Sequence, residues 1–234
     1  MSDECVPINF ERPIPLFPLD QVVLLPLQVL PLHVFEPRYR QMVAGALDGP
    51  GFIAMASFEG EAWKQQYHGR PPLRPAVCIG QIIEHERLAD GRFAILLQGR
   101  CRARIVKELK PEGDRLYRSA MLEPIGLGTP DEKTLAPVRV EIKRLLSSDP
   151  LTKLRAARPL SEYIENPSVP TAAVLELVSY AVISDAELRY RLLADGDVES
   201  RSRLIFRELR HLGSLVRKAA AQRSEEWPKG CSWN

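Results

Sequence analysis

The residue types best suited to acid–base chemistry stand together in one short run, Glu84-His85-Glu86. A glutamate and a histidine can act as general acid and base only when both reach the same reacting atom. The run lies in a stretch with strand-like alternation, and neighbouring side chains on a strand point to opposite faces of the sheet. His85 therefore diverges from the two glutamates, and we expect no catalysis here.

His33 and Glu36 have the spacing of a His-x-x-Glu metal pair. Zinc sites use three or four protein ligands, and no third candidate lies nearby in the sequence, so we expect both residues to be structural. The cysteines are too far apart for a Cys-x-x-Cys pair: Cys5, Cys78, Cys101 and Cys231. We predict no metal and no cofactor, and we interpret the cysteines as reduced thiols of a cytoplasmic protein.

Motifs of catalytic domains are absent from the sequence. No Gly-x-Ser-x-Gly elbow surrounds any serine, and no GxxxxGK[ST] loop occurs. The first motif positions the nucleophilic serine of α/β-hydrolases, and the second cradles nucleotide phosphates. We therefore expect a protein that is not an enzyme.

Arg100, Arg102 and Arg104 form a row on one face of a predicted strand, spaced roughly 7 Å apart. Such a row could contact the phosphates of a nucleic acid or the carboxylates of a protein partner. The alternative is a solvated face on which the arginines pair with nearby glutamates. The candidates for that pairing are Glu84, Glu86 and Glu123.

Trp63 and Tyr67 lie in a polar, proline-rich stretch from residue 59 to 75. Long loops are often functional, and exposed aromatic side chains are enriched at interfaces. Both residues are therefore candidate partner contacts. The alternative is that they fold back onto the rest of the domain.

The clearest structural element is a hairpin from Val77 to Val106. On its second strand the residues from Phe93 to Ile105 alternate between an apolar face and the arginine face, which is typical of a half-buried strand. A three-residue turn at 89–91 sets a register in which Glu84 and Glu86 share the arginine face. That register turns Gln81 and His85 inward.

Prolines dominate the first 35 residues, yet the apolar runs 16–19 and 22–25 predict short strands that end at prolines. The first helix begins at Pro37, which suits the first helical position, and ends at Gly49. Strands are predicted at 52–58 and at about 116–125. The segment 126–130 is small and flexible and marks a domain boundary.

Helical periodicity dominates the chain after that boundary. The predicted helices span 132–147, 161–165, 171–183, 185–193 and 198–223, with Asp131, Thr171 and Ser184 as caps. The last helix is basic, with seven Lys and Arg against two Glu between residues 199 and 223. These patterns predict an α+β protein with a β-rich part, 1–126, and an α-helical part, 127–234.

Three stretches of the sequence resemble the Lon N-terminal (substrate-binding) domain family. The first runs from Ile14 to Arg40 and includes Leu30-Pro31-Leu32-His33-Val34-Phe35-Glu36-Pro37. The second is Ile79 to Phe93 with Gly99, Arg102 and Ile105, and the third begins Arg191-Leu192-Leu193-Ala194-Asp195-Gly196. Leu27 departs from the family, which usually has glycine after the proline, and the loop 59–75 is longer than usual.

The resemblance implies a PUA-like β pseudo-barrel with one helix, followed by a helical bundle. It also implies that the chain recognises proteins, as this domain does at the front of Lon proteases. The similarity is greatest to short, stand-alone members without the ATPase and peptidase domains. A peptidase label would then be inherited from the family name.

Composition fits such a module. The chain has 234 residues, 45% hydrophobic and 26% charged, with a net charge of +2, so it is globular and no polycation. The apolar stretch 22–35 is broken by Pro26 and Pro31 and is too short to cross a membrane. The acidic N-terminus lacks the layout of a signal peptide, so we expect a cytoplasmic location and no membrane partner.

Our leading hypothesis is a module that binds unfolded client proteins or peptides, in a groove between barrel and bundle and at the loop 59–75, and that works with a separate protease. An edge strand or apolar pockets would hold an extended peptide. The alternative is RNA binding, since PUA-like barrels also occur in RNA-modifying proteins. The arginine row and the basic helix favour RNA, whereas the near-neutral charge and the lack of an aromatic stacking pair oppose it.

Overall fold

A computed structural model describes residues 7–61, 63–66, 69–110, 112–126, 128 and 131–221. The chain divides into two compact units: residues 1–128 with 184–197, and residues 129–183 with 198–234. The sequence places the same boundary within two residues of 126 but assigns everything beyond it to the helical part. In the structure the segment 184–197 returns to the first unit. None of the described helices is long and apolar enough to cross a membrane.

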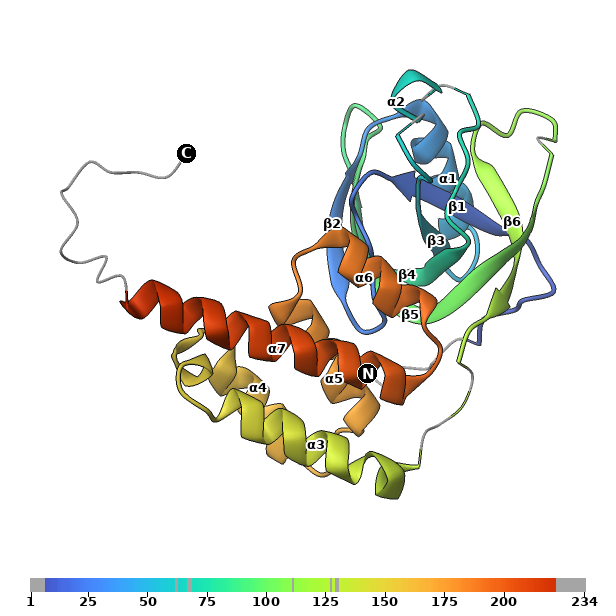
Figure 1. Cartoon of the computed structure of the whole chain (residues 1–234). Helices are drawn as coiled ribbons and strands as arrows, with labels where there is room; N and C mark the ends of the chain where they lie inside the picture. Colours follow the sequence, from blue (N-terminus) through green and yellow to red (C-terminus); the bar gives the residue numbers. More distant parts are fainter. Residues whose placement is uncertain are drawn as a thin grey trace, which may run out of the picture. The chain divides into compact units, whose positions relative to one another are not determined.

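The first unit is a six-stranded sheet with the order β2-β5-β4-β3-β1-β6 (Figure 1). An additional pairing between β5 and β6 closes five of these strands into a barrel, while β2 pairs with β5 alone. The strands are β1 (Ile14–Leu19), β2 (Val29–Val34), β3 (Phe52–Ser57), β4 (Ala76–Arg87), β5 (Phe93–Glu108) and β6 (Arg118–Pro124). This architecture confirms the predicted α+β class.

The core of the barrel follows the predicted alternation of β5. Phe93, Ile95, Leu97 and Ala103 point inward and are buried. Gly99 lies between them where the chain before β2 crosses the strand. A β-carbon on this glycine would lie 2.2 Å from the carbonyl oxygen of Leu25, so only glycine fits.

The run 22–25 is not a strand, contrary to the sequence prediction. Val23, Leu24 and Leu25 are buried, but the backbone of the run pairs with none of the described strands. Instead the Leu25 N–H donates to the side chain of Gln28 over 3.2 Å, and the Leu27 N–H donates to the Gly99 carbonyl over 2.9 Å. Leu27 has φ +66°, the left-handed region that favours glycine. The backbone therefore keeps the left-handed turn, although leucine stands where the family usually has glycine.

The register of the hairpin is correct near its turn and wrong further down. Glu86 pairs with Ala94 and His85 with Ile95, as predicted, but the register shifts between Ile82 and Glu84. The extra residue is Ile83, whose insertion is a β-bulge. After the bulge Gln81 pairs with Gln98 on the outer face instead of pointing inward.

Three helices complete the barrel unit: α1 (Pro37–Leu47), α2 (Trp63–Gln66) and α6 (Ala186–Ala194). The predicted stripe of α1 is buried, and the rings of Phe17 and Tyr39 lie 4.5 Å apart. The carboxylate of Asp185 caps α6 by accepting from the Leu188 N–H over 2.8 Å, in place of the predicted Ser184. The described helix of the loop 59–75, α2, has only four residues.

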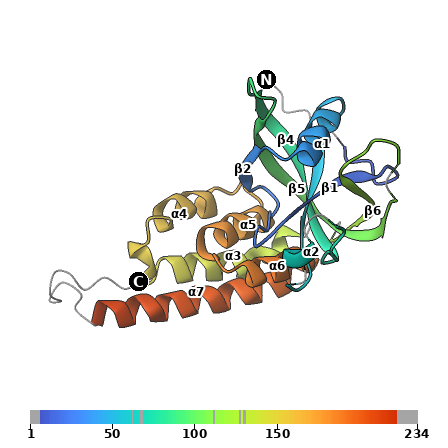
Figure 2. The ribbon, with the colours of Figure 1, turned by 90° about the horizontal axis from the view of Figure 1, so that it is seen from above.

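The second unit is helical: α3 (Glu132–Leu146), a short 3-10 turn (Leu151–Lys153), α4 (Ala157–Glu165), α5 (Thr171–Val182) and α7 (Val198–Ala221). The long α7 lies alongside α3 (Figure 2). Asp131 caps α3 as predicted, whereas α4 begins four residues before the expected 161. Arg139 organises the α4–α5 connection by donating to the carbonyls of Ile164 and Val169 over 2.9 and 2.7 Å.

Candidate functional site

The predicted arginine row exists, but its three side chains are engaged within the protein. Arg100 donates twice to the Gln81 amide oxygen, over 3.0 and 2.7 Å. Arg102 is buried and donates to the carbonyl of Leu192, near the end of α6, over 3.1 Å. Arg104 forms an ion pair with Glu123, the glutamate pairing that the sequence offered as the alternative. Contact of this row with a partner stays a prediction.

Arg102 is one of three anchors that hold α6 on the barrel. Arg74 binds Glu187 through two hydrogen bonds of 2.5 and 3.0 Å and lies over the ring of Tyr190, 3.3 Å from its centroid. The Tyr190 hydroxyl accepts from the Ala76 N–H over 2.9 Å. Burial raises the pKa of Tyr190, so this hydroxyl stays protonated at neutral pH. Arg102 is thus the member of the arginine row that anchors α6 on the barrel.

Trp63 takes the alternative that the sequence analysis left open. Its ring stacks on Phe58, with centroids 5.1 Å apart and planes 10° from parallel. Tyr67 lies outside the described residues. A role of either residue in partner contact remains a prediction.

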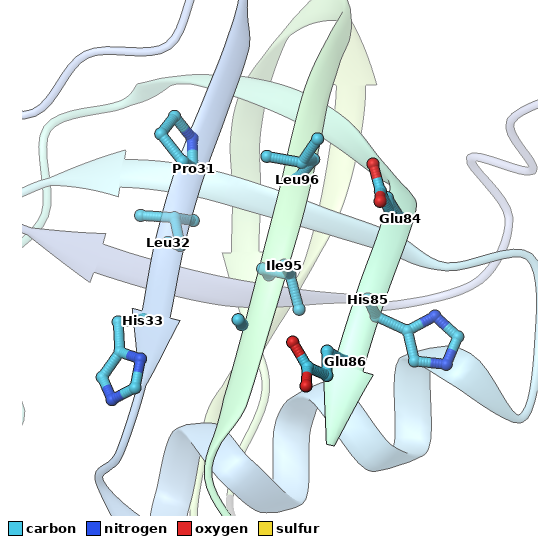
Figure 3. Close-up of a pocket in the computed structure, with 9 residues that line it drawn as sticks. Pro31, Leu32, His33, Glu84, His85, Glu86, Ile95 and Leu96 are labelled. Atoms are coloured by element: carbon cyan, nitrogen blue, oxygen red, sulfur yellow. The ribbon is translucent and has the colours of Figure 1, made fainter. Parts of the chain in front are cut away.

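A different surface is open in the structure, at the tip where β2, β5 and β4 run side by side (Figure 3). The strand registers align Pro31 with Leu96 and Glu84, and His33 with Ala94 and Glu86. These six side chains share the outer side of the three strands and are exposed or half-buried. We call them the ribbon face. They line most of a hollow of about 450 Å³.

The outer edge of β2 is the second feature of this surface. Because β2 pairs with β5 alone, its other edge has no strand partner within the described chain. The Gly99 N–H donates to the Gln28 carbonyl, which makes Leu30, Leu32 and Val34 the residues bonded to β5. The backbone groups of Val29, Pro31 and His33 therefore face outward. Pro31 has no N–H, so the edge offers donors at two positions instead of three.

The ribbon face combines an apolar centre with carboxylates along one side. Pro31, Ala94 and Leu96 form the centre, and Glu84 and Glu86 come from β4. Figure 3 shows Glu86 turned toward β5 and His85 turned away from it, as strand geometry requires. The predicted divergence within the Glu84-His85-Glu86 run is therefore present. The arrangement suits binding of an extended, partly apolar chain rather than proton transfer.

The other candidate ligands are held by structural contacts. The His33 Nε2 atom lies 3.0 Å from an Arg92 guanidinium nitrogen and accepts its hydrogen, while Glu36 pairs with Arg38 over 2.9 Å. Within the described ranges no group of three or more His, Cys, Asp or Glu side chains could hold a metal ion. Burial raises the pKa of Cys101 to about 11, so this cysteine is an unreactive thiol.

Sequence reasoning missed the ribbon face. The sequence analysis predicts no strand around Pro31, but proline is accepted on an edge strand at a position whose N–H would face outward. The pattern Leu30-Pro31-Leu32-His33-Val34, with its more buried residues alternating with exposed ones, carried that signal. The sequence predicts the hairpin of β4 and β5, but not β2, the third strand of the ribbon face.

The chain matches the model of one protein family over residues 13–211, the substrate-binding domain of the ATP-dependent protease La (LON). It is 26% identical over 193 residues to Lon protease 2 of Herpetosiphon aurantiacus, covering 81% of this chain and 23% of that protein. It is 21% identical over 224 residues to a Lon protease of Desulfosudis oleivorans, covering 92% and 26%. The chain spans about a quarter of the length of these two relatives.

Solved structures show the same fold. The N-terminal domain of a Mycobacterium avium complex Lon protease superposes with a TM-score of 0.60 at 21% identity, covering 85% of this chain and 98% of that one. A Lon N-terminal domain protein from Xanthomonas campestris gives 0.54 at 18% identity, covering 88% and 98%. Together with the family match over most of the sequence, these results establish that the chain belongs to the family of Lon substrate-binding domains.

Proposed function

We propose that this chain is a non-catalytic module that recognises protein substrates for proteolysis or quality control by binding extended polypeptide segments on the ribbon face. The observation that carries the proposal is the coincidence of an open strand edge on β2 with a hollow whose lining is apolar on β2 and β5 and acidic on β4. The edge supplies backbone hydrogen bonds and the hollow receives alternate side chains. In strand addition the first give affinity and the second give specificity.

The expected ligand follows from the chemistry of the surface. A segment added to β2 would place every second side chain on the outer side, beside Pro31, which favours apolar residues there. Glu84 and Glu86 carry negative charge on the far side of the hollow, so a long basic side chain two positions from the apolar one, on the same face, would be favoured. Folded proteins keep their strands paired, and the surface would therefore select unfolded segments.

Binding of an unfolded chain tests the proposal directly. The probe is a secretory protein kept unfolded by reduction and carboxymethylation of its cysteines, with its native, disulfide-bonded form as control. We expect calorimetric binding of the unfolded form only. Amide hydrogen exchange should slow at Val29 and His33, whose N–H groups face outward, and should not slow at Leu30 or Leu32. Binding with no change in exchange along β2 would contradict the proposed site.

The alternative function, RNA binding, rests on the arginine row and the basic helix, whose arginines have partners within the protein. The arginine row that suggested it donates to Gln81, to the Leu192 carbonyl and to Glu123. On the basic helix α7, Arg210 pairs with Glu141 over 2.7 Å and Arg201 with Glu176 over 3.5 Å. We therefore favour a polypeptide ligand, with unfolded clients and a protease that acts on them as the partners.

A further inference from the structure

A second hollow of the barrel unit, of about 580 Å³, is lined by four arginines. It lies where the start of α1 faces the segment that leads into β6. We call Arg38, Arg70, Arg115 and Arg118 the arginine hollow. No part of it belongs to the ribbon face.

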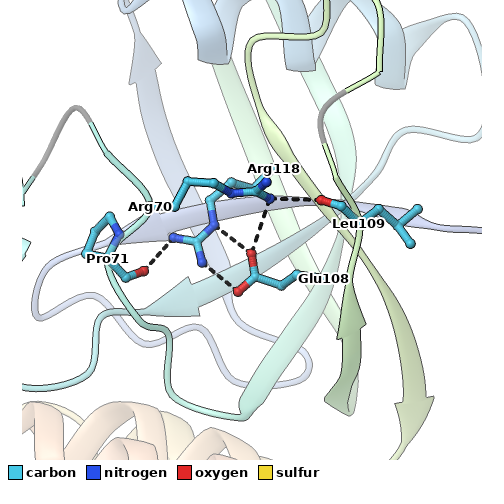
Figure 4. A network of polar contacts seen from close by, with 5 residues as sticks. All are labelled: Arg70, Pro71, Glu108, Leu109 and Arg118. Atoms are coloured by element: carbon cyan, nitrogen blue, oxygen red, sulfur yellow. Dashed lines mark hydrogen bonds and ion pairs between the residues drawn. The ribbon is translucent and has the colours of Figure 1, made fainter.

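Two of the four arginines serve the fold. Arg118 binds both carboxylate oxygens of Glu108, over 2.9 and 2.6 Å, and donates to the Pro71 carbonyl over 2.7 Å (Figure 4). Arg38 pairs with Glu36 and lies over the ring of Tyr39, 4.6 Å from its centroid. Their geometry is fixed, and they contribute charge to the hollow rather than adaptable donors.

The other two arginines are poorly matched by carboxylates. Arg70 donates to the Leu109 carbonyl over 2.9 Å, but the carboxylate near it is Glu108 at 3.5 Å, which Arg118 already holds. Arg115 reaches Glu112 only at 3.4 Å. The side chain of Arg115 is 21% exposed and that of Glu112 is 81% exposed, so the arginine is held against the protein while its partner extends into water.

This mismatch leaves donors and charge inside the hollow. Each guanidinium carries five N–H groups, and most of those on Arg70 and Arg115 have no acceptor within the described chain. Four guanidinium groups face three carboxylates, those of Glu36, Glu108 and Glu112. Water still reaches these weakly paired guanidinium groups, and a ligand that brings a carboxylate can replace that water with charge-assisted hydrogen bonds.

The walls of the hollow favour a polypeptide over a small ion. Leu116 is 60% exposed beside the arginines, and the rings of Tyr39 and Tyr117 complete the apolar part of the lining. The helix dipole of α1 adds a further positive contribution at its first turn.

We propose that the arginine hollow binds an acidic segment of a polypeptide, with Asp or Glu carboxylates on Arg115 and Arg70 and neighbouring apolar side chains on Leu116. The proposal rests on the proposed function only in taking the ligand to be a polypeptide. The barrel would then have two contact surfaces of opposite charge preference, since the ribbon face carries Glu84 and Glu86. A client with separate basic and acidic segments would engage both.

The test uses the full chain and two decapeptides that are identical except that one has glutamate wherever the other has glutamine, the remaining residues being leucine and tyrosine. We expect the glutamate peptide to bind about tenfold or more tightly in calorimetry at low salt, and its advantage to shrink at high salt. Arg115→Gln and Arg70→Gln should each remove most of that advantage. Arg115→Lys should retain part of it.

Arg158→Gln is the matched control, because Arg158 is 92% exposed and its contact with Glu162 is 3.9 Å long. It should leave the glutamate peptide's affinity unchanged, and thermal melts should show that all variants fold. Equal affinity of the two peptides, an equal loss in Arg158→Gln, or tighter Arg115-dependent binding of a uridine oligonucleotide would overturn the proposal. The outcome is independent of whether the unfolded-protein probe binds the ribbon face.

Discussion

The two halves of β5 have the same alternating pattern, but their outer side chains have different surroundings. In the first half the outer side chains are Ala94 and Leu96, which lie between β2 and β4 and are half-buried. In the second half they are Arg102 and Arg104, where α6 packs on the strand. The apolar outer residues are accessible, while the charged ones are buried or paired.

The contrast shows that a row of charges on a strand does not by itself mark a contact surface. Arg102 supplies a hydrogen bond to a carbonyl near the end of α6, a role that requires burial of its guanidinium. The open half has few charges on β5 and lies beside β2, whose outer edge pairs with none of the other described strands. Binding and stability should therefore respond to substitutions in different halves of the same strand.

Gly99→Ala, at the junction of the halves, should have the largest effect. Its new methyl group would lie 2.2 Å from the Leu25 carbonyl oxygen, so strand and crossing chain must separate. We expect the free energy of unfolding to fall by about 3 kcal/mol in urea titrations. Gly128→Ala is the control, since a methyl group there would meet no atom within 4 Å and its φ is ordinary. Equal losses in both variants would refute the close crossing.

Arg102→Ala should come next. Removal of a buried guanidinium leaves the Leu192 carbonyl without its donor, and we expect a loss of about 2 kcal/mol in the free energy of unfolding. Arg104→Ala on the same face should cost about 0.5 kcal/mol or less, because its ion pair with Glu123 is exposed. If the two losses were equal, α6 would not dock through Arg102.

Leu27 tests the turn that leads into β2. Its φ of +66° is tolerated by glycine and strained for a β-branched residue. Leu27→Val should therefore be less stable than Leu27→Gly by about 1 to 2 kcal/mol in chemical denaturation. A valine variant as stable as the glycine variant would show that the turn does not need the left-handed conformation.

The smallest effect should be a pH dependence at the α6 anchor. The hydrogen bonds from Arg74 hold the pKa of Glu187 below its ordinary value of 4.5. Such a carboxylate stabilises the folded state above that value, and the contribution disappears as pH falls through the lowered pKa. When the free energy of unfolding is measured from about pH 5 downward, it should therefore fall more steeply for the natural chain than for Glu187→Gln. Parallel pH curves for the two chains would contradict a contribution of the Arg74–Glu187 pair to stability.

Local patterns were enough to predict the fold class and most elements. Proline at the first position of α1, the alternation of β5 and the helical periodicity after residue 130 depend on near neighbours in the sequence. The bulge at Ile83 and the docking of α6 depend on contacts between distant segments. The burial of Arg102 follows from α6, so its role could not be read from the strand itself.

The candidate site was predicted even less completely. The sequence correctly places the Glu84-His85-Glu86 run on a strand with diverging side chains. It does not predict the edge strand β2, which contains Pro31. Leu96 is one more apolar residue in a hairpin, and it becomes a contact candidate only because it lines the hollow beside the edge strand. The under-matched Arg115 becomes visible only when the distance to Glu112 and the exposure of both side chains are known.

The most direct test compares Leu96→Glu with Val106→Glu. Both substitutions place a carboxylate on β5, the first on the ribbon face and the second at an exposed position, 60% accessible, in the other half. With the unfolded, carboxymethylated probe in calorimetry, we predict about a tenfold or greater loss of affinity for Leu96→Glu and no loss for Val106→Glu. Equal affinities of the two folded variants would contradict binding at the ribbon face.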